Sequence, residues 1–180
     1  MIELFRDADG FTHTIAGLVL LGRLGDIGST RLITPTLRLE ANPVVRRLGW
    51  WFAWSTILVA AIPYFSPQIG VAVLAASLMV TASNLSRGWV FRALGEAESD
   101  EFMLRIAARS QRRTALAFLF AGALFVILAG GVLMWLSGSI QFATFWFAVG
   151  LVIYGLAIGI HGSAYIVRLF RRARAIAPVV

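Results

Sequence analysis

Long apolar segments separated by short polar ones dominate the pattern of this chain. Four of these segments are about 18 residues or longer, which is the length that an α-helix needs to cross a bilayer. They cover residues 48–65, 69–91, 114–136 and 140–167. We therefore predict four membrane-spanning helices, arranged as two pairs that are each joined by a short uncharged turn.

A fifth apolar segment, residues 11–34, is interrupted by charged side chains. Its uninterrupted apolar part ends at Gly22, and Arg23 and Asp26 follow directly. Charges at membrane depth are unfavourable unless they pair or face protein. We predict that this segment is a fifth span, with an interfacial or re-entrant segment as the alternative. The expected fold is an all-α, polytopic integral membrane helical bundle that forms one transmembrane domain over residues 1–180.

Composition agrees with a membrane protein and limits its partners. Hydrophobic residues make up 59% of the 180 residues, and all 16 basic side chains are arginines, giving a formal net charge of +7. The arginines lie between and after the apolar segments rather than on a separate soluble domain, so nucleic-acid binding is not expected. Anionic lipid headgroups are the expected partners. The absence of cysteine excludes disulfides and thiolate chemistry.

The arginine-rich loops predict an orientation. Arginines concentrate in residues 38–47, 87–113 and 168–174, and five spans place all three groups on one side of the membrane. The positive-inside rule makes that side cytoplasmic, with the C-terminus inside and the N-terminus outside. Residues 95–113 then form a cytoplasmic connecting segment. The first ten residues are acidic rather than basic, so we expect no cleaved signal peptide.

Three of the predicted helices carry polar side chains along one face, because residues three or four apart share a helical face. These polar faces consist of Arg23, Asp26 and Thr30; of Ser77, Thr81, Asn84 and Arg87; and of Tyr154, His161, Tyr165 and Arg168. Polar groups in hydrocarbon need protein partners, so we expect the three faces to pack together.

The convergence of these faces predicts an intramembrane polar site that opens toward the cytoplasm. Glu40 and Asn42 follow the first segment and are expected to cap the site, since Pro43 redirects the chain there. The candidate ligand-binding residues are Arg23, Asp26, Thr30, Glu40, Asn42, Asn84, Arg87, His161 and Tyr165. A structural role is the alternative for each: an internal ion pair for Arg23, interhelical hydrogen bonds for Asn84, and extension to the interface for Arg87.

The sequence favours binding over catalysis without naming a ligand. It contains no closely spaced metal-ligand pair, no serine nucleophile motif and no phosphate-binding glycine loop, so no metal site is predicted and neither a cofactor nor catalytic residues are indicated. We expect a protein that binds or carries a polar or ionic ligand. The alternatives are a non-catalytic accessory subunit of a larger membrane complex and a membrane enzyme acting on lipid headgroups. Gly155 and Gly159 form a small-residue pair that favours close helix packing, within the chain or across a homo-oligomer.

Residues 25–49, GDIGSTRLITPTLRLEANPVVRRLG, resemble a pattern found in uncharacterised small prokaryotic multi-spanning membrane proteins. The pattern is Asp-x-x-Ser/Thr-Thr followed by Glu-x-Asn-Pro. It is matched by Asp26, Ser29, Thr30, Glu40, Asn42 and Pro43. The resemblance implies only a joint role for Asp26 and Glu40, and it implies no activity. We expect the protein to lie in a prokaryotic inner or plasma membrane. Arg23 and Arg31 depart from the pattern.

Overall fold

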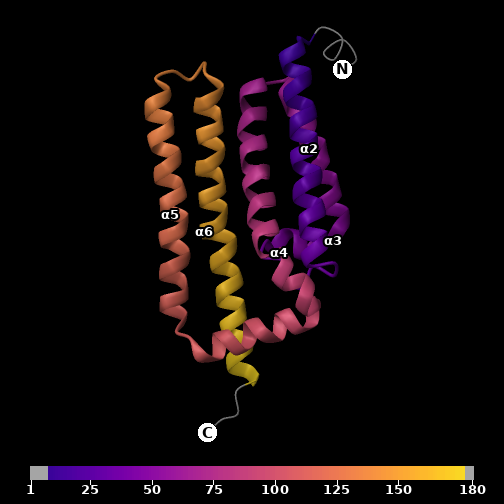
Figure 1. Ribbon diagram of the computed structural model, residues 1–180, viewed down its shortest axis with the longest axis vertical. Helices are drawn as coiled ribbons and strands as arrows, with labels where there is room; N and C mark the ends of the chain where they lie inside the picture. The colour runs from indigo at the N-terminus through magenta and orange to yellow at the C-terminus, as the bar shows by residue number, and fades with distance from the viewer. Residues whose placement is uncertain (1–7, 177–180) are drawn as a thin grey trace.

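The computed structural model describes residues 8–176, which form helices and short turns without a strand in that range. The elements are α2 (Gly10–Ile33), α3 (Pro43–Ser55), the 3₁₀-helix η1 (Thr56–Tyr64), α4 (Pro67–Arg109), α5 (Arg112–Ser137) and α6 (Ala143–Ile176). Figure 1 shows them side by side in an elongated bundle. The all-α prediction is confirmed, whereas the predictions about the N-terminal end concern residues 1–7 and lie outside the described part.

Three helices of the described part, α4, α5 and α6, are long and apolar enough to cross a membrane. They contain the predicted spans 69–91, 114–136 and 140–167 except for the first few residues of the last one, which form the α5–α6 turn. Pro67 begins α4, where its missing N–H leaves no helical hydrogen bond unmade. Gly138 ends α5 in the left-handed conformation (φ 67°), as is usual for a glycine after a helix.

The predicted span 48–65 is not one regular α-helix. Helix α3 contains a break at Gly49, where φ is 77° and ψ is −166°, and it gives way at Thr56 to the 3₁₀-helix η1. The Thr56 hydroxyl donates a hydrogen bond to the Ala53 carbonyl (2.6 Å), and Pro63 within η1 has no N–H to donate. The Thr56 hydrogen bond and the missing N–H of Pro63 both disfavour a continuous α-helix here, and η1 adopts the tighter 3₁₀ geometry, which rises about 2.0 Å per residue.

Helix α4 extends far beyond its predicted span because it bends rather than ends. Gly95 has φ 75° and ψ 165°, a conformation that glycine adopts without a side-chain clash. Residues 96–109, which we call the transverse segment, then cross one end of the bundle (Figure 1). The buried Ala107 of this segment packs with Leu169 and Phe170 of α6. The predicted connecting segment 95–113 is therefore largely helical and folded against the bundle.

The arginine-bearing segments gather at that same end. The 34–42 loop, the transverse segment, the α4–α5 turn and the end of α6 lie together in Figure 1, and the α5–α6 turn lies at the opposite end. Away from the arginine-rich end, α2 and α4 pack around Ile15, Val19 and Val71. The bundle thus has an apolar interior toward one end and a polar, arginine-rich other end.

Close helix packing in the second half of the chain depends on small residues. A Cβ on Gly150 would lie 2.3 Å from the Ala72 carbonyl oxygen, so α6 and α4 meet backbone to backbone. A Cβ on Gly155 would lie 3.0 Å from the Ala123 carbonyl of α5, whereas Gly159 has nothing closer than 3.9 Å. Of the predicted small-residue pair, Gly155 therefore makes its close contact within the chain.

Candidate functional site

A cavity of about 160 Å³ lies at the arginine-rich end of the bundle, between α2, the 34–42 loop, α4 and α6. Its lining residues are Thr30, Ile33, Thr34, Leu39, Glu40, Ala41, Asn84, Arg87, Phe91, Met103 and Tyr165. Five of the nine predicted site residues line this cavity, and they come from four separate parts of the chain: Thr30, Glu40, Asn84, Arg87 and Tyr165. The structure places the other four outside the lining.

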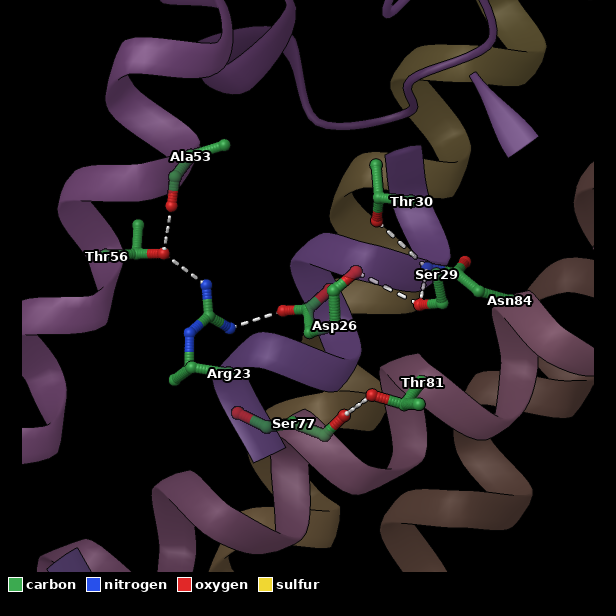
Figure 2. A network of polar contacts seen from close by, with 9 residues as sticks. All are labelled: Arg23, Asp26, Ser29, Thr30, Ala53, Thr56, Ser77, Thr81 and Asn84. Atoms are coloured by element: carbon green, nitrogen blue, oxygen red, sulfur yellow. Dashed lines mark hydrogen bonds and ion pairs between the residues drawn. The ribbon is translucent and has the colours of Figure 1, made fainter. Parts of the chain in front are cut away.

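Asn84 connects the polar faces of α4 and α2. Its amide nitrogen donates to the hydroxyl oxygens of Ser29 (3.1 Å) and Thr30 (3.0 Å), as Figure 2 shows. The Ser29 hydroxyl donates in turn to the Asp26 backbone carbonyl (3.0 Å). These contacts hold the two helices in register beside the cavity, and they engage the amide nitrogen of Asn84 rather than its carbonyl oxygen.

Arg23 and Asp26 form an ion pair and do not line the cavity. The Arg23 guanidinium pairs with the Asp26 carboxylate one helical turn further on and also donates to the Thr56 hydroxyl (Figure 2). Both side chains are mostly buried, at 18% and 15% exposed. Pairing offsets part of the desolvation cost of the two charges, as the structural alternative expects, while the buried Arg23 Nε atom has no hydrogen-bond partner in the described part of the chain. They connect α2 to the α3–η1 junction.

The 34–42 loop carries Glu40 into the cavity wall. The Glu40 Oε1 atom accepts a hydrogen bond from the Asn42 backbone N–H (2.7 Å), and Arg168 donates to the Glu40 backbone carbonyl (2.9 Å). Burial raises the pKa of the Glu40 carboxyl above its ordinary value of 4.5; the Asn42 hydrogen bond opposes this rise and the charge of Asp26 adds to it. Asn42 itself caps α3 by accepting from Val44 N–H (2.9 Å), so its role is structural.

Arg87 reaches the cavity from α4 without an acidic partner. Its guanidinium donates to the Ser83 carbonyl (3.2 Å) and the Ser83 hydroxyl (2.7 Å), both on its own helix. Among residues 8–176, the Glu40 carboxylate has no cationic partner and the Arg87 guanidinium no anionic one. The cavity therefore presents one negative and one positive charge that do not neutralise each other.

Tyr165 and His161 share a face of α6 but differ in surroundings. Tyr165 lines the cavity, and its ring lies 5.2 Å from the Arg168 guanidinium carbon. His161, one helical turn away, lies outside the cavity lining, and its buried Nδ1 atom has no hydrogen-bond partner in the described part of the chain. The helical spacing correctly places the two residues on one face, but the cavity begins only at the level of Tyr165.

Two acidic residues that the sequence analysis did not select hold the 34–42 loop in place. The first, Glu96, accepts hydrogen bonds from the Thr34 hydroxyl and from the backbone N–H groups of Thr36 (3.0 Å) and Arg38 (2.8 Å). Burial alone would raise the pKa of Glu96, but these hydrogen bonds outweigh it and lower the pKa. Gly95 directly before Glu96 is the sequence signal that could have indicated a bend there.

Asp100 forms the second loop contact. Its carboxylate accepts two hydrogen bonds from Arg172 of α6 (2.8 and 2.7 Å) and forms an ion pair with Arg38 of the loop (2.9 Å). The hydrogen bonds and charge of Arg172, with the charge of Arg38, lower the pKa of the Asp100 carboxyl. Asp100 thus joins the loop, the transverse segment and α6 into one charged cluster.

Within the described range, no group of three His, Asp or Glu side chains is arranged to hold a metal ion. No protein-family model, curated protein or solved structure matches this chain. The functional argument therefore depends on the geometry of the cavity and on the charges that line it.

Proposed function

We propose that this chain is an integral membrane protein that binds or carries a small polar or ionic ligand in the cavity at the arginine-rich end of its bundle. The observation that carries the proposal is the cavity itself, lined by Glu40 and Arg87 with their charges unpaired within residues 8–176. The Arg87 side chain is exposed and Glu40 is half-buried, so water hydrates these charges in the free protein and a polar or ionic ligand can replace that water.

A five-span arrangement is part of this proposal. Helix α2 is continuous over 24 residues, about 36 Å at 1.5 Å per residue, which exceeds the hydrocarbon thickness of a bilayer. The α3–η1 segment runs antiparallel beside it. Three contacts support this pairing along the length of α2: His13 with Tyr64, Arg23 with Thr56, and Pro35 with Trp50.

The proposed orientation places the arginine-rich end on the cytoplasmic side of a prokaryotic inner membrane, with the cavity opening toward the cytoplasm and anionic headgroups around it. The chain has no cysteine, so a single introduced cysteine is the only thiol that a maleimide can label. We expect a membrane-impermeant maleimide added to intact cells to label Gln141→Cys in the α5–α6 turn and not Ser110→Cys in the α4–α5 turn. Both positions are exposed. Labelling of Ser110→Cys alone contradicts the orientation.

The polar contacts leading inward from the cavity support binding rather than an open channel. They run from Asn84 through the Ser29 hydroxyl to the Asp26 backbone carbonyl, and the Asp26 carboxylate pairs with Arg23. The interior toward the other end of α2 is the apolar cluster of Ile15 and Val19. A polar path that ends in apolar packing suits a binding site or one state of a carrier. The lipid-enzyme alternative receives less support, because His161 lies outside the cavity lining.

Thermal stability in detergent tests the proposal, because a ligand that binds the folded state raises the melting temperature. The probes are inorganic phosphate, ethanolamine and glycine. We expect at least one to stabilise the wild type and to lose its effect with Arg87→Gln or Glu40→Gln. The matched controls are Arg105→Gln and Glu101→Gln, which remove exposed charges on the same helix α4. No stabilisation by any probe contradicts the proposal and favours an accessory subunit.

A further inference from the structure

We infer that the ligand of this cavity is a small zwitterion, with a cationic amine held by Glu40 and an anionic carboxylate or phosphate held by Arg87. The inference rests on the proposed function and names the chemical class of its ligand. Glu40 reaches the cavity from the 34–42 loop and Arg87 reaches it from α4, so two opposite charges border the same space.

The first step is that both charges are available. The Glu40 carboxylate is held only by backbone N–H groups of Ala41 and Asn42, and no cationic side chain pairs with it within residues 8–176. The Arg87 guanidinium is bound only to Ser83, which leaves one terminal nitrogen without a partner in the same range. A ligand that carries both complementary charges satisfies both groups at once, whereas a simple cation or anion leaves one of them unpaired.

The second step concerns the neighbouring charges. Asp26 is paired with Arg23 and does not line the cavity, and its negative charge acts on Glu40 less strongly than burial does. Arg168 is engaged by the Glu40 backbone carbonyl and by the Tyr165 ring, and it does not line the cavity. The groups that line the cavity therefore sum to zero, which a ligand of zero net charge matches best.

The volume of the cavity and the polarity of its lining limit the ligand further. A volume of about 160 Å³ is about five times the share of one water molecule, and it therefore suits a ligand on the order of five to eight non-hydrogen atoms. The Asn84 carbonyl and the Tyr165 hydroxyl add hydrogen-bonding groups, and Ile33, Phe91 and Met103 supply an apolar wall for a short carbon chain. Free amino acids and the phosphoethanolamine group of a lipid share this chemistry.

The test measures binding to the purified protein in detergent by calorimetry. The zwitterions are glycine, β-alanine and O-methyl phosphoethanolamine, a phosphodiester with the single negative charge of the lipid headgroup, and the half-ligands are ethanolamine, acetate and inorganic phosphate. We expect the best zwitterion to bind about tenfold or more tightly than either of its half-ligands, since each charge-assisted hydrogen bond contributes about that factor. Glu40→Gln is expected to remove this advantage over the anion, and Arg87→Gln the advantage over the amine. Glu101→Gln and Arg105→Gln should leave all affinities unchanged.

The outcomes separate this inference from the proposed function. If the half-ligands bind as tightly as the zwitterions and their binding still depends on Glu40 or Arg87, the inference of a zwitterionic ligand is wrong. The proposed binding site would still stand. If no probe binds, both are overturned. If Glu40→Gln does not fold, Arg87→Gln decides the question alone. Nanodiscs with and without phosphatidylethanolamine distinguish the sources. Weaker binding of O-methyl phosphoethanolamine when the lipid is present indicates that the lipid headgroup occupies the cavity, and equal binding in both kinds of nanodisc indicates a free zwitterion.

Discussion

Asp100 joins three segments of the chain, and replacing it with asparagine tests how the 34–42 loop is held over the cavity. The carboxylate is only 3% exposed, accepts two hydrogen bonds from Arg172 and forms an ion pair with Arg38. The asparagine side chain of the Asp100→Asn variant would have nearly the same shape, but it would present an amide NH₂ to guanidinium groups that are themselves donors. The substitution therefore removes the charge and part of the hydrogen bonding without creating a cavity.

The expected loss of folding stability in Asp100→Asn depends on how exposed the two arginine partners of Asp100 are. Breaking a fully buried ion pair typically destabilises a protein by about 3 to 5 kcal/mol, because a charge is left without water or partner. Here the side chains of Arg172 and Arg38 are 38% and 53% exposed, so water can hydrate them once residue 100 is neutral. We therefore expect a loss of about 2 to 3 kcal/mol, close to that of hydrogen bonds between charged groups.

The assay is reversible unfolding of the purified protein in mixed micelles, followed by helical circular dichroism. Glu101→Gln is the matched control, because it removes the same charge from the next residue of α4 while its exposed side chain has no hydrogen bond or ion pair in the described part of the chain. We expect the control to change the free energy of unfolding by less than about 0.5 kcal/mol. An Asp100→Asn variant that matches the control refutes the reasoning.

Two further measurements check the same cluster. In a double-mutant cycle with Arg172→Gln, we expect a coupling energy between about 0.5 and 3 kcal/mol, and additive effects would show that the pair does not interact. The pKa of Asp100 is lower in the folded state than its ordinary value of 3.8, so its stabilisation is complete above that value and is lost as the pH falls through the lowered pKa. The stability difference between wild type and Asp100→Asn should therefore persist at about pH 5 and shrink only in stronger acid.

The remaining predictions concern the cavity and the helix contacts. Because the pKa of Glu40 is raised above 4.5, zwitterion affinity should begin to fall, as the pH is lowered, at a pH above that value, and calorimetry should find no such step in Glu40→Gln. The charged groups around Glu40 are Asp26, Arg87 and Arg168. Asn84→Leu should lower the free energy of unfolding by about 1 kcal/mol by removing its interhelical hydrogen bonds, and an unchanged value would contradict their role. Gly150→Ala should destabilise the protein through its clash with the Ala72 carbonyl, whereas Gly131→Ala, with nothing within 4 Å, should be nearly neutral in the same unfolding assay.

Most of the correct predictions from the sequence come from two features, the length of the apolar segments and the helical spacing of the polar residues. The long apolar segments 69–91, 114–136 and 140–167 correspond to α4, α5 and α6, since no proline interrupts them. Residues 48–65 also form an uncharged, mainly apolar stretch, but Gly49 and Pro63 alter the backbone there, and an apolar count does not register backbone conformation. The same spacing rule places Asn84 and Arg87 on one face of α4, and both line the cavity.

The spacing of residues along one helix shows which side chains share a face. It does not show which of them border a cavity, or which residue of another segment pairs with a charged side chain. Arg23 and Asp26 were candidates for ligand binding, yet Thr56 of η1 completes their pairing away from the cavity. Glu96 and Asp100 belong to a stretch expected to be a connector. Their contacts with the 34–42 loop arise only after α4 has bent, which is a property of the tertiary structure.

The bend at Gly95 therefore relates the fold directly to the proposed site. A side chain there would disfavour the positive φ, and a straight α4 would carry Glu96 and Asp100 away from the loop. With the bend, these two carboxylates hold the loop from one side while Arg168 holds the Glu40 carbonyl from α6. The loop then forms a wall of the cavity whose lining also includes Arg87. The position of Glu40 in the cavity wall thus depends on Glu96, Asp100 and Arg168, which hold the backbone of its loop, and on the Asn42 N–H, which holds its carboxylate without a cationic partner in the described part of the chain.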